Sequence, residues 1–266
     1  MPFEILVIDQ TEDQKQKEEV KILVSKFSKV KYFHLSTKGS AQAKNFGIRT
    51  SLGKIICFLD DDCLALPNWL GIASKHFLNY RYPICLLGRI KLGGELLLKG
   101  DYRLWDENNE RLFLGKVDPW IFKATGANIF MPRVIFDKVG LFDERFGPGS
   151  PWRSGEDADL LYRISLTRIP IAYAPSVAII HRDWRDFKAE YQNLYDYGLG
   201  VGGLLGKYLM VGDLFFSRTV ALRFSRKFIR LLWGLLSLNQ PMALEGYYWS
   251  AGIMAGFMRY LYRCKL

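Results

Sequence analysis

Blocks of hydrophobic and polar residues alternate along the first part of the chain and predict strands and helices in turn. Apolar runs of strand length lie at 3–9, 30–36 and 54–62, and polar segments that become periodic lie between them at 10–27 and 37–53. An order of strand, helix, strand, helix, strand is typical of an α/β fold with a mostly parallel central sheet flanked by helices. The run at 54–62 is β-branched and apolar up to its acids, which predicts a buried central strand.

Further elements follow with less regular spacing. We expect a strand at 83–94, a helix that opens at Gly155 and a strand at 171–184. Beyond these elements the chain becomes apolar and aromatic, with Arg and Lys at intervals. The pattern therefore predicts an α/β domain at 1–203 and a basic, apolar helical tail at 204–266.

Positive charge is concentrated in this tail. The chain has 266 residues and a formal net charge of +10, and the tail holds nine Lys/Arg against two Asp/Glu, a net of +7. Its longest uncharged stretches, 231–244 and 246–258, are shorter than the roughly 20 apolar residues of a membrane-spanning helix. Arginines clustered beside an apolar run favour a helix in the membrane interface. The alternative is a helical appendage packed on the domain.

The same charge distribution and the cysteines bear on partners and compartment. Because the basic residues gather in an apolar tail and no nucleic-acid motif appears, we expect no nucleic-acid partner. The four cysteines form no CxxC pair, which fits reduced thiols in a reducing compartment. The chain opens with a short strand pattern and not with that of a signal peptide, so we expect a cytoplasmic protein.

Three adjacent acids end the apolar run at 54–62. In an extended or turning segment residues i and i+2 point the same way, so Asp60 and Asp62 are expected to face one site and Asp61 another. Carboxylate oxygens suit a hard divalent cation, Mg²⁺ or Mn²⁺. The alternative is a solvated turn. Asp9 ends another predicted strand, and the carboxyl ends of parallel strands share one edge of a sheet, where ligands bind.

Other polar residues at element ends are candidates for the same site. Glu156 and Asp157 stand at a predicted helix start, where they either complement the helix dipole or supply a general base. His181 ends the last strand, as a structural residue, a third metal ligand or a phosphate contact. Lys44 follows a predicted helix N-terminus, and both suit a diphosphate.

The order of these segments resembles that of the family 2 glycosyltransferases, inverting enzymes of the GT-A fold that use nucleotide-sugar donors. The stretches that carry the resemblance are "ILVIDQTED", "GSAQAKNFGI", "ICFLDDDC", "TGANIFMPRVIFDKVGLFDERF" and "GEDADLLYR". They run in the family's order and spacing from about residue 3 to 185. The combination is more specific than any one motif.

The resemblance implies a role for each matching residue. Asp60 and Asp62 would form the metal and diphosphate site, with His181 as a further metal ligand, and Asp61 would reach the ribose or sugar. The remaining roles concern the donor and the acceptor: Asp9 would contact the nucleobase, Lys44 and Asn45 the donor, and Asp157 would be the catalytic base with Glu156 beside it.

The implied reaction is transfer of a sugar, with inversion, from a nucleotide-sugar donor to an acceptor hydroxyl, with Mn²⁺ or Mg²⁺ as cofactor. A basic interfacial tail favours a glycan or lipid-linked acceptor and a peripheral location on the inner face of the plasma membrane. Two alternatives are a metal-dependent nucleotidyltransferase and an inactive family member that acts as a membrane or interaction protein.

One departure from the family concerns the start of the sheet. Family members begin with an earlier strand that lies inside the sheet and whose loop helps to hold the nucleotide, and this chain shows no such segment. We expect a truncated sequence and a gap in the sheet, with unpaired backbone groups along it.

Overall fold

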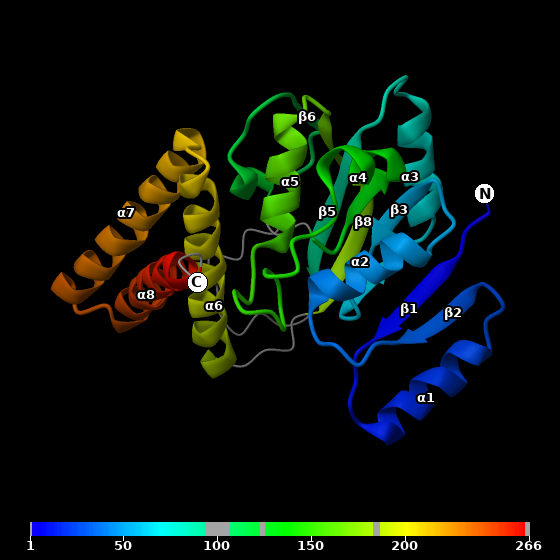
Figure 1. The fold of residues 1–266 in the computed structure, drawn as a ribbon, viewed down its shortest axis with the longest axis horizontal. Coiled ribbons are helices and arrows are strands. Elements are labelled where there is room, and N and C mark those ends of the chain that lie inside the picture. Colours follow the sequence, from blue (N-terminus) through cyan, green and yellow to red (C-terminus); the bar gives the residue numbers. More distant parts are fainter. Residues whose placement is uncertain (1, 94–106, 123–125, 183–186, 264–266) are drawn as a thin grey trace. The chain divides into compact units, whose positions relative to one another are not determined.

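A computed structural model describes residues 2–93, 107–122, 126–182 and 187–263 (Figure 1). The last residues of the strands predicted at 83–94 and 171–184, and of the tail predicted at 204–266, lie outside these ranges. The chain divides into two compact units. The first comprises Met1–Leu96, Gly100–Glu144 and Leu160–Asp183, and the second comprises Leu97–Lys99, Arg145–Asp159 and Trp184–Leu266.

The first unit contains two sheets (Figure 1). In the smaller one, β1 (Ile5–Asp9) pairs in parallel with β2 (Val30–His34), and α1 (Gln14–Ser25) connects them and contacts β2. The larger sheet has the order β3-β7-β5-β8-β4, with β6 also paired to β8. Its strands are β3 (Ile55–Phe58), β4 (Cys63–Ala65), β5 (Cys85–Gly93), β6 (Arg111–Phe113), β7 (Ile129–Pro132) and β8 (Ile171–Arg182).

The pairing directions correct one prediction. The α/β class is confirmed, but the described strands form a mixed sheet and not a mostly parallel one. β1–β2 and β5–β8 are parallel, whereas β3–β7, β4–β8, β5–β7 and β6–β8 are antiparallel. Each antiparallel pair joins strands that are distant in the chain, such as Cys63 of β4 and His181 of β8, so long-range pairing sets these directions and the local alternation of strands and helices does not.

β3 does not lie where the apolar run predicts. It stands at one end of the described strand order, with β7 as its partner, and Ile55 keeps 38% of its surface exposed while Ile56 keeps 7%. The prediction of a buried central strand is therefore wrong for the described chain. No described strand joins the β1–β2 sheet to β3, which matches the expected gap in the sheet.

Helices cover both faces of the larger sheet. Successive side chains of a strand point to opposite faces, and buried apolar side chains lie on both of them. The covering helices are α2 (Ser40–Thr50), α3 (Trp69–Leu78), α4 (Arg133–Val139) and α5 (Glu156–Leu166), and a short 3₁₀ turn, η1, spans Pro119–Phe122. Leu87 of β5 belongs to the same buried cluster as residues of α2, α4 and α5, whereas its neighbour Leu86 belongs to a second cluster with residues of α3. α2 begins directly after Gly39, as the sequence predicts.

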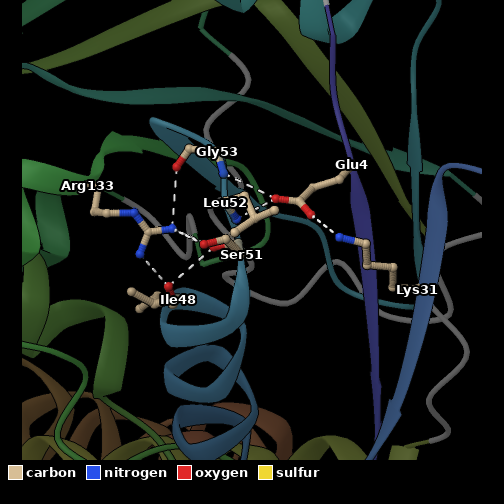
Figure 2. Close-up of polar contacts among 7 residues, drawn as sticks. All are labelled: Glu4, Lys31, Ile48, Ser51, Leu52, Gly53 and Arg133. Atoms are coloured by element: carbon tan, nitrogen blue, oxygen red, sulfur yellow. Dashed lines mark hydrogen bonds and ion pairs between the residues drawn. The ribbon is translucent and has the colours of Figure 1, made fainter.

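Two charged side chains hold the connection between α2 and β3 (Figure 2). Arg133, at the start of α4, donates to the Ile48 carbonyl in the last turn of α2. It also donates to the carbonyls of Ser51 and Gly53, just after the helix, and to the Ser51 hydroxyl, 2.9 Å away. Glu4, next to β1, accepts from the backbone N–H groups of Leu52 and Gly53 and pairs with Lys31 at 2.9 Å. This connection is thereby tied to both sheets, and it leads directly into β3 and the acids that follow it.

The second unit is built on three long helices, α6 (Phe187–Met210), α7 (Leu214–Leu236) and α8 (Gln240–Arg263). Residue 204, where the tail is predicted to begin, lies inside α6. Glycines allow α6 and α8 to approach closely, since a Cβ added at Gly202 would lie 2.0 Å from the carbonyl oxygen of Ile253. Among the helices that the structure describes, none has the length and apolar character required to cross a membrane.

Candidate active site

The three acids form a tight turn between β3 and β4. The Cys63 N–H donates to the Asp60 carbonyl at 3.1 Å, which closes the turn. Asp60 and Asp61 are exposed, and Asp62 is half-buried. The turn therefore places carboxylates of graded exposure at the end of β3, as the sequence predicts for this edge of the sheet.

Strand pairing brings His181 to Asp62. β4 pairs with β8 in the register Cys63↔His181, and the Arg182 N–H donates to the Asp62 carbonyl at 2.8 Å. The His181 Nε2 lies 3.4 Å from the Asp62 Oδ2. The other ring nitrogen, Nδ1, is buried and has no hydrogen-bond partner among the described residues. Two residues that are far apart in sequence thus present a carboxylate and an imidazole to one point.

This donor set fits a divalent cation. Ligand atoms of Asp62, Cys63 and His181 all lie within 4.8 Å of one another. Carboxylate oxygen with imidazole nitrogen is a common ligand combination for Mn²⁺, and exposed Asp60 stands in the same turn. Burial raises the pKa of the Cys63 thiol, and the charges of Asp60 and Asp62 raise it further. The negative charges of Asp60 and Asp62 therefore both reach the Cys63 thiol, which is protonated at neutral pH.

Asp9 ends β1, as predicted, and its carboxylate already has protein partners. Oδ1 accepts from the Thr11 N–H at 2.8 Å, and Oδ2 accepts from the Tyr32 hydroxyl at 2.7 Å. Partial burial alone would raise the pKa of Asp9, but these hydrogen bonds outweigh it and the pKa lies below its ordinary value. Burial and the bond to Asp9 raise the pKa of Tyr32 to about 12. Asp9 is therefore an anion held in a fixed orientation.

The two predicted donor-binding residues of α2 differ in their surroundings. The Lys44 ammonium lies 5.2 Å from the centre of the Phe142 ring. Asn45 is buried, and its amide donates to the Phe142 carbonyl and to Glu144 while accepting from the Phe142 N–H. These bonds join "AKN" to "FDE", two motifs nearly a hundred residues apart, so the described contacts give Asn45 the task of positioning the segment after α4.

The acids at the start of α5 divide by burial. Glu156 is buried against Gly147, where an added Cβ would lie 2.9 Å from the Glu156 Cδ, and Asp157 is half-buried. Asp159 is fully buried and binds the Lys207 ammonium at 2.5 Å and the Tyr208 hydroxyl at 2.9 Å. The sequence pattern did not single out Asp159. Two features of the sequence could have indicated it: its i+2 spacing from Asp157, and the Lys-Tyr pair in α6 that binds it. Neither feature is specific.

Trp152 and the aromatic residues around it have a structural role. Trp152 is buried, stacks on Phe146 at 5.4 Å between ring centres and donates to the Gly256 carbonyl at 3.2 Å. Tyr260 of α8 also packs against Trp152, with 5.5 Å between the ring centres. These rings fill the core of the second unit, so they do not offer a sugar-binding surface.

Comparison with known sequences points to one family. The model of the family described as "Glycosyl transferase family 2" matches residues 1–140. An uncharacterized glycosyltransferase of Rickettsia conorii is 33% identical over 165 residues, which cover 61% of this chain and 25% of that protein. The pre-mycofactocin glycosyltransferase of Mycobacterium tuberculosis is 23% identical over 164 residues, covering 59% of this chain and 34% of that protein. The chain spans about a quarter of the length of the first of these relatives.

Comparison with solved structures agrees at the level of the fold. The mannosyltransferase PcManGT of Pyrobaculum calidifontis, solved in complex with GDP-Man and Mn²⁺, superposes with a TM-score of 0.57 at 14% identity. The match covers 98% of this chain and 78% of the mannosyltransferase. At this identity the likeness shows a shared fold.

Proposed function

Because the chain belongs to glycosyltransferase family 2, we propose that it transfers a sugar, with inversion, from a nucleotide-sugar donor to an acceptor hydroxyl. The predicted family and the α/β glycosyltransferase fold are both confirmed by the comparisons. The observation that carries the proposal is the meeting of Asp62 and His181 at the end of β3. The comparisons do not favour the nucleotidyltransferase or the interaction-protein alternative.

The donor side of the proposal uses the residues at the strand ends. Asp60, Asp62 and His181 would hold Mn²⁺ or Mg²⁺. The mannosyltransferase of similar fold, solved with GDP-Man and Mn²⁺, supports the choice of a divalent ion. When bound, such an ion would offset the charge that grows on the leaving diphosphate. Asp61 is exposed and is proposed to reach the ribose or sugar.

Three further residues complete the proposed donor site. Asp9, an oriented anion, is proposed to accept hydrogen bonds from the nucleobase. Lys44 is proposed to contact the phosphates as a cation. Asn45 would act on the donor site by holding the segment that contains Phe142 and Glu144.

The acceptor side rests on Asp157. It stands in the first turn of α5 and is half-buried, so its carboxylate meets both protein and solvent. We assign it the role of general base, which takes the proton from the acceptor hydroxyl as that oxygen attacks the anomeric carbon. Glu156 lies beside it and is buried, which fits a residue that supports the helix start.

The tail supports a membrane-bound acceptor, such as a lipid-linked glycan. α7 carries no acid between Leu214 and Leu236, and its surface combines exposed apolar residues with arginines. Ile229, Trp233 and Leu236 keep 61%, 62% and 79% of their surfaces exposed. We propose that this face lies in the interface of an anionic membrane, which places the protein peripherally on the inner face of the plasma membrane.

Sedimentation of the full chain with vesicles tests the membrane assignment. Anionic vesicles are expected to bind it and zwitterionic vesicles are not. Reversing two exposed charges of α7, Arg218→Glu with Arg226→Glu, should abolish binding, because each basic residue near an anionic surface contributes about 1 kcal/mol. The matched control, Lys15→Glu with Lys17→Glu in α1, changes the net charge equally. Equal binding by both double variants would refute the assignment.

Product analysis tests the reaction itself. With a nucleotide sugar, an acceptor preparation and Mn²⁺, the account predicts release of a nucleoside diphosphate and a product of inverted anomeric configuration by NMR. Release of pyrophosphate from a nucleoside triphosphate and a sugar phosphate would indicate a nucleotidyltransferase instead. A retained anomeric configuration would contradict the base assigned to Asp157.

A further inference from the structure

The proposed donor site contains a sulfur atom that the transfer reaction does not use. Cys63 follows Asp62 directly in the chain and is the register partner of His181 in the β4–β8 pair. Its Sγ lies 3.6 Å from the Asp62 Oδ1 and, with the His181 ring, falls inside the cluster of ligand atoms within 4.8 Å of one another. Strand pairing, and not chance proximity of surface chains, therefore sets the three groups together.

The distances suit a small, four-coordinate ion. With metal–ligand bonds of about 2.0–2.3 Å, neighbouring donors on a tetrahedron lie about 3.3–3.6 Å apart. The Asp62–His181 distance is 3.4 Å and the Cys63–Asp62 distance is 3.6 Å, each ending on a different oxygen of one carboxylate. The third pair of donors, on Cys63 and His181, lies within the 4.8 Å of the cluster. The buried Nδ1 of His181 leaves Nε2 as the ring atom that faces the cluster.

The donor set differs in softness from a site built for Mn²⁺ or Mg²⁺ alone. Those ions prefer oxygen ligands, whereas thiolate sulfur with imidazole selects Zn²⁺ and other thiophilic ions. One sulfur, one nitrogen and one oxygen leave a fourth position open, which is the arrangement of an accessible zinc site.

We propose that Asp62, Cys63 and His181 form a three-ligand centre that takes thiophilic divalent ions, Zn²⁺ foremost, through the Cys63 sulfur. On binding, the Cys63 S–H bond breaks, its proton passes to solvent and a sulfur–metal bond forms, with no change of oxidation state. Since Asp62 and His181 are shared with the proposed donor metal, Zn²⁺ would compete with Mn²⁺ and inhibit transfer. This consequence rests on the proposed function, whereas the metal binding does not.

A structural role for Cys63 would leave the same contacts without a metal. Cys63 is buried in the cluster that includes Trp69 of α3, where its thiol packs and donates weakly to Asp62. The two roles differ in whether sulfur bonds to a bound metal, which spectroscopy reads directly.

The test is a Co²⁺ titration of the reduced full chain, followed by its absorption spectrum. A cobalt–thiolate bond gives an intense near-ultraviolet charge-transfer band that nitrogen and oxygen ligands do not give. The band is expected in the wild type and in the control Cys57→Ser, which changes a half-buried cysteine of β3, and is expected to be lost in Cys63→Ser. Displacement of Co²⁺ should show Zn²⁺ affinity falling at least about tenfold in Cys63→Ser, and Mn²⁺ affinity changing far less.

Two outcomes would overturn the proposal: a wild-type spectrum without the charge-transfer band, or a band that persists in Cys63→Ser. Should Cys63→Ser not fold, alkylation of wild-type Cys63, located by peptide mass, replaces it, and protection by Zn²⁺ but not by Mn²⁺ is then expected. Equal alkylation with and without Zn²⁺ would overturn the proposal. No sugar donor or acceptor is present, so the result is independent of whether the protein transfers a sugar.

Discussion

Two groups of acids in this protein have similar sequences and different surroundings. Asp60–Asp62 lie in an open turn after β3, where two of the three carboxylates are exposed and the third meets a histidine. Glu156, Asp157 and Asp159 lie in the first turn of α5, where Asp159 is fully buried against a lysine and a tyrosine.

The difference shows that the burial of a carboxylate decides whether it stabilises the fold or is available for binding and catalysis. A buried carboxylate must be matched by protein cations and donors, because leaving its charge unpaired costs several kcal/mol. Asp159 is matched in this way and acts as an anchor for α6. Asp62 is half-buried, and its contacts include the His181 imidazole and the Cys63 thiol, two groups that can bind a metal ion together with it. Asp157, two residues from Asp159, is partly exposed, which suits the proposed role of general base.

The largest expected effect separates Asp157 from its buried neighbour. Asp157→Asn should lower the rate of sugar transfer by about 10²–10⁴-fold, because a positioned general base contributes that much. Its melting temperature and its affinity for the donor nucleotide should stay near those of the wild type. The measurement is kcat with saturating donor and acceptor. Full activity of Asp157→Asn would remove the base assignment.

Asp159→Asn should show the opposite behaviour and lose stability. Removing one charge of a buried pair leaves Lys207 without its carboxylate and costs about 3 kcal/mol, which lowers the melting temperature by on the order of 10 °C. The control is Asp196→Asn, which breaks the more exposed pair with Arg153 and should cost less than about 1 kcal/mol. Calorimetric melting of both variants measures the difference. Equal melting temperatures for both variants would show that Asp159 is no anchor.

At the strand-end acids, the sharpest variant is His181→Gln. It should weaken Mn²⁺ binding by about 10–100-fold without lowering the melting temperature, since it removes a ligand at the surface of the sheet. His76→Gln in α3 is the matched control, because His76 contacts Ser176 at 3.0 Å and Glu110 at 3.9 Å and is not part of the cluster of ligand atoms around Asp62. Electron paramagnetic resonance of free Mn²⁺ gives both affinities. Unchanged affinity in His181→Gln would leave the metal site to carboxylates alone.

The smallest expected effect concerns Asp9. Its pKa lies below the unfolded value, so its hydrogen bonds stabilise the fold above the unfolded pKa, and this stability is lost as the pH falls through the folded pKa. Asp9→Asn should therefore cost about 1 kcal/mol or less at pH 7, and the difference from the wild type should shrink in acid. Urea unfolding at pH 7 and pH 3 measures it, with Tyr32→Phe as the control for the lost hydroxyl bond. A difference that grows in acid would contradict the assignment.

The sequence predicts where strands and helices begin and end better than it predicts which of them pair or pack together. The apolar runs that end in Asp9 and in Asp60 are strands, and α2 begins after Gly39, because local pattern and turn residues decide these features. The edge position of β3 and the mixed sheet depend on which strands pair, which no local pattern encodes. The same holds for the clamp of Asn45 on the segment after α4, since that contact joins residues 97 positions apart.

Within the candidate site, residue types at strand ends could be predicted and their partners could not. His181 was a candidate because it ends a strand, and the β4–β8 register supplies the reason that it meets Asp62. Asp159 resembles its neighbours in sequence, and only the position of Lys207 in α6 distinguishes it.

The central claim is that the turn at Asp60–Asp62 binds a donor diphosphate through a divalent ion. Calorimetric titration of the wild type and of Asp62→Asn with GDP and UDP, each with Mn²⁺ and with EDTA, tests it most directly. The account predicts that the wild type binds at least one of these nucleotides with Mn²⁺, that EDTA abolishes the binding, and that Asp62→Asn weakens it at least about tenfold while keeping the melting temperature. Equal binding in EDTA, or by Asp62→Asn, would contradict it.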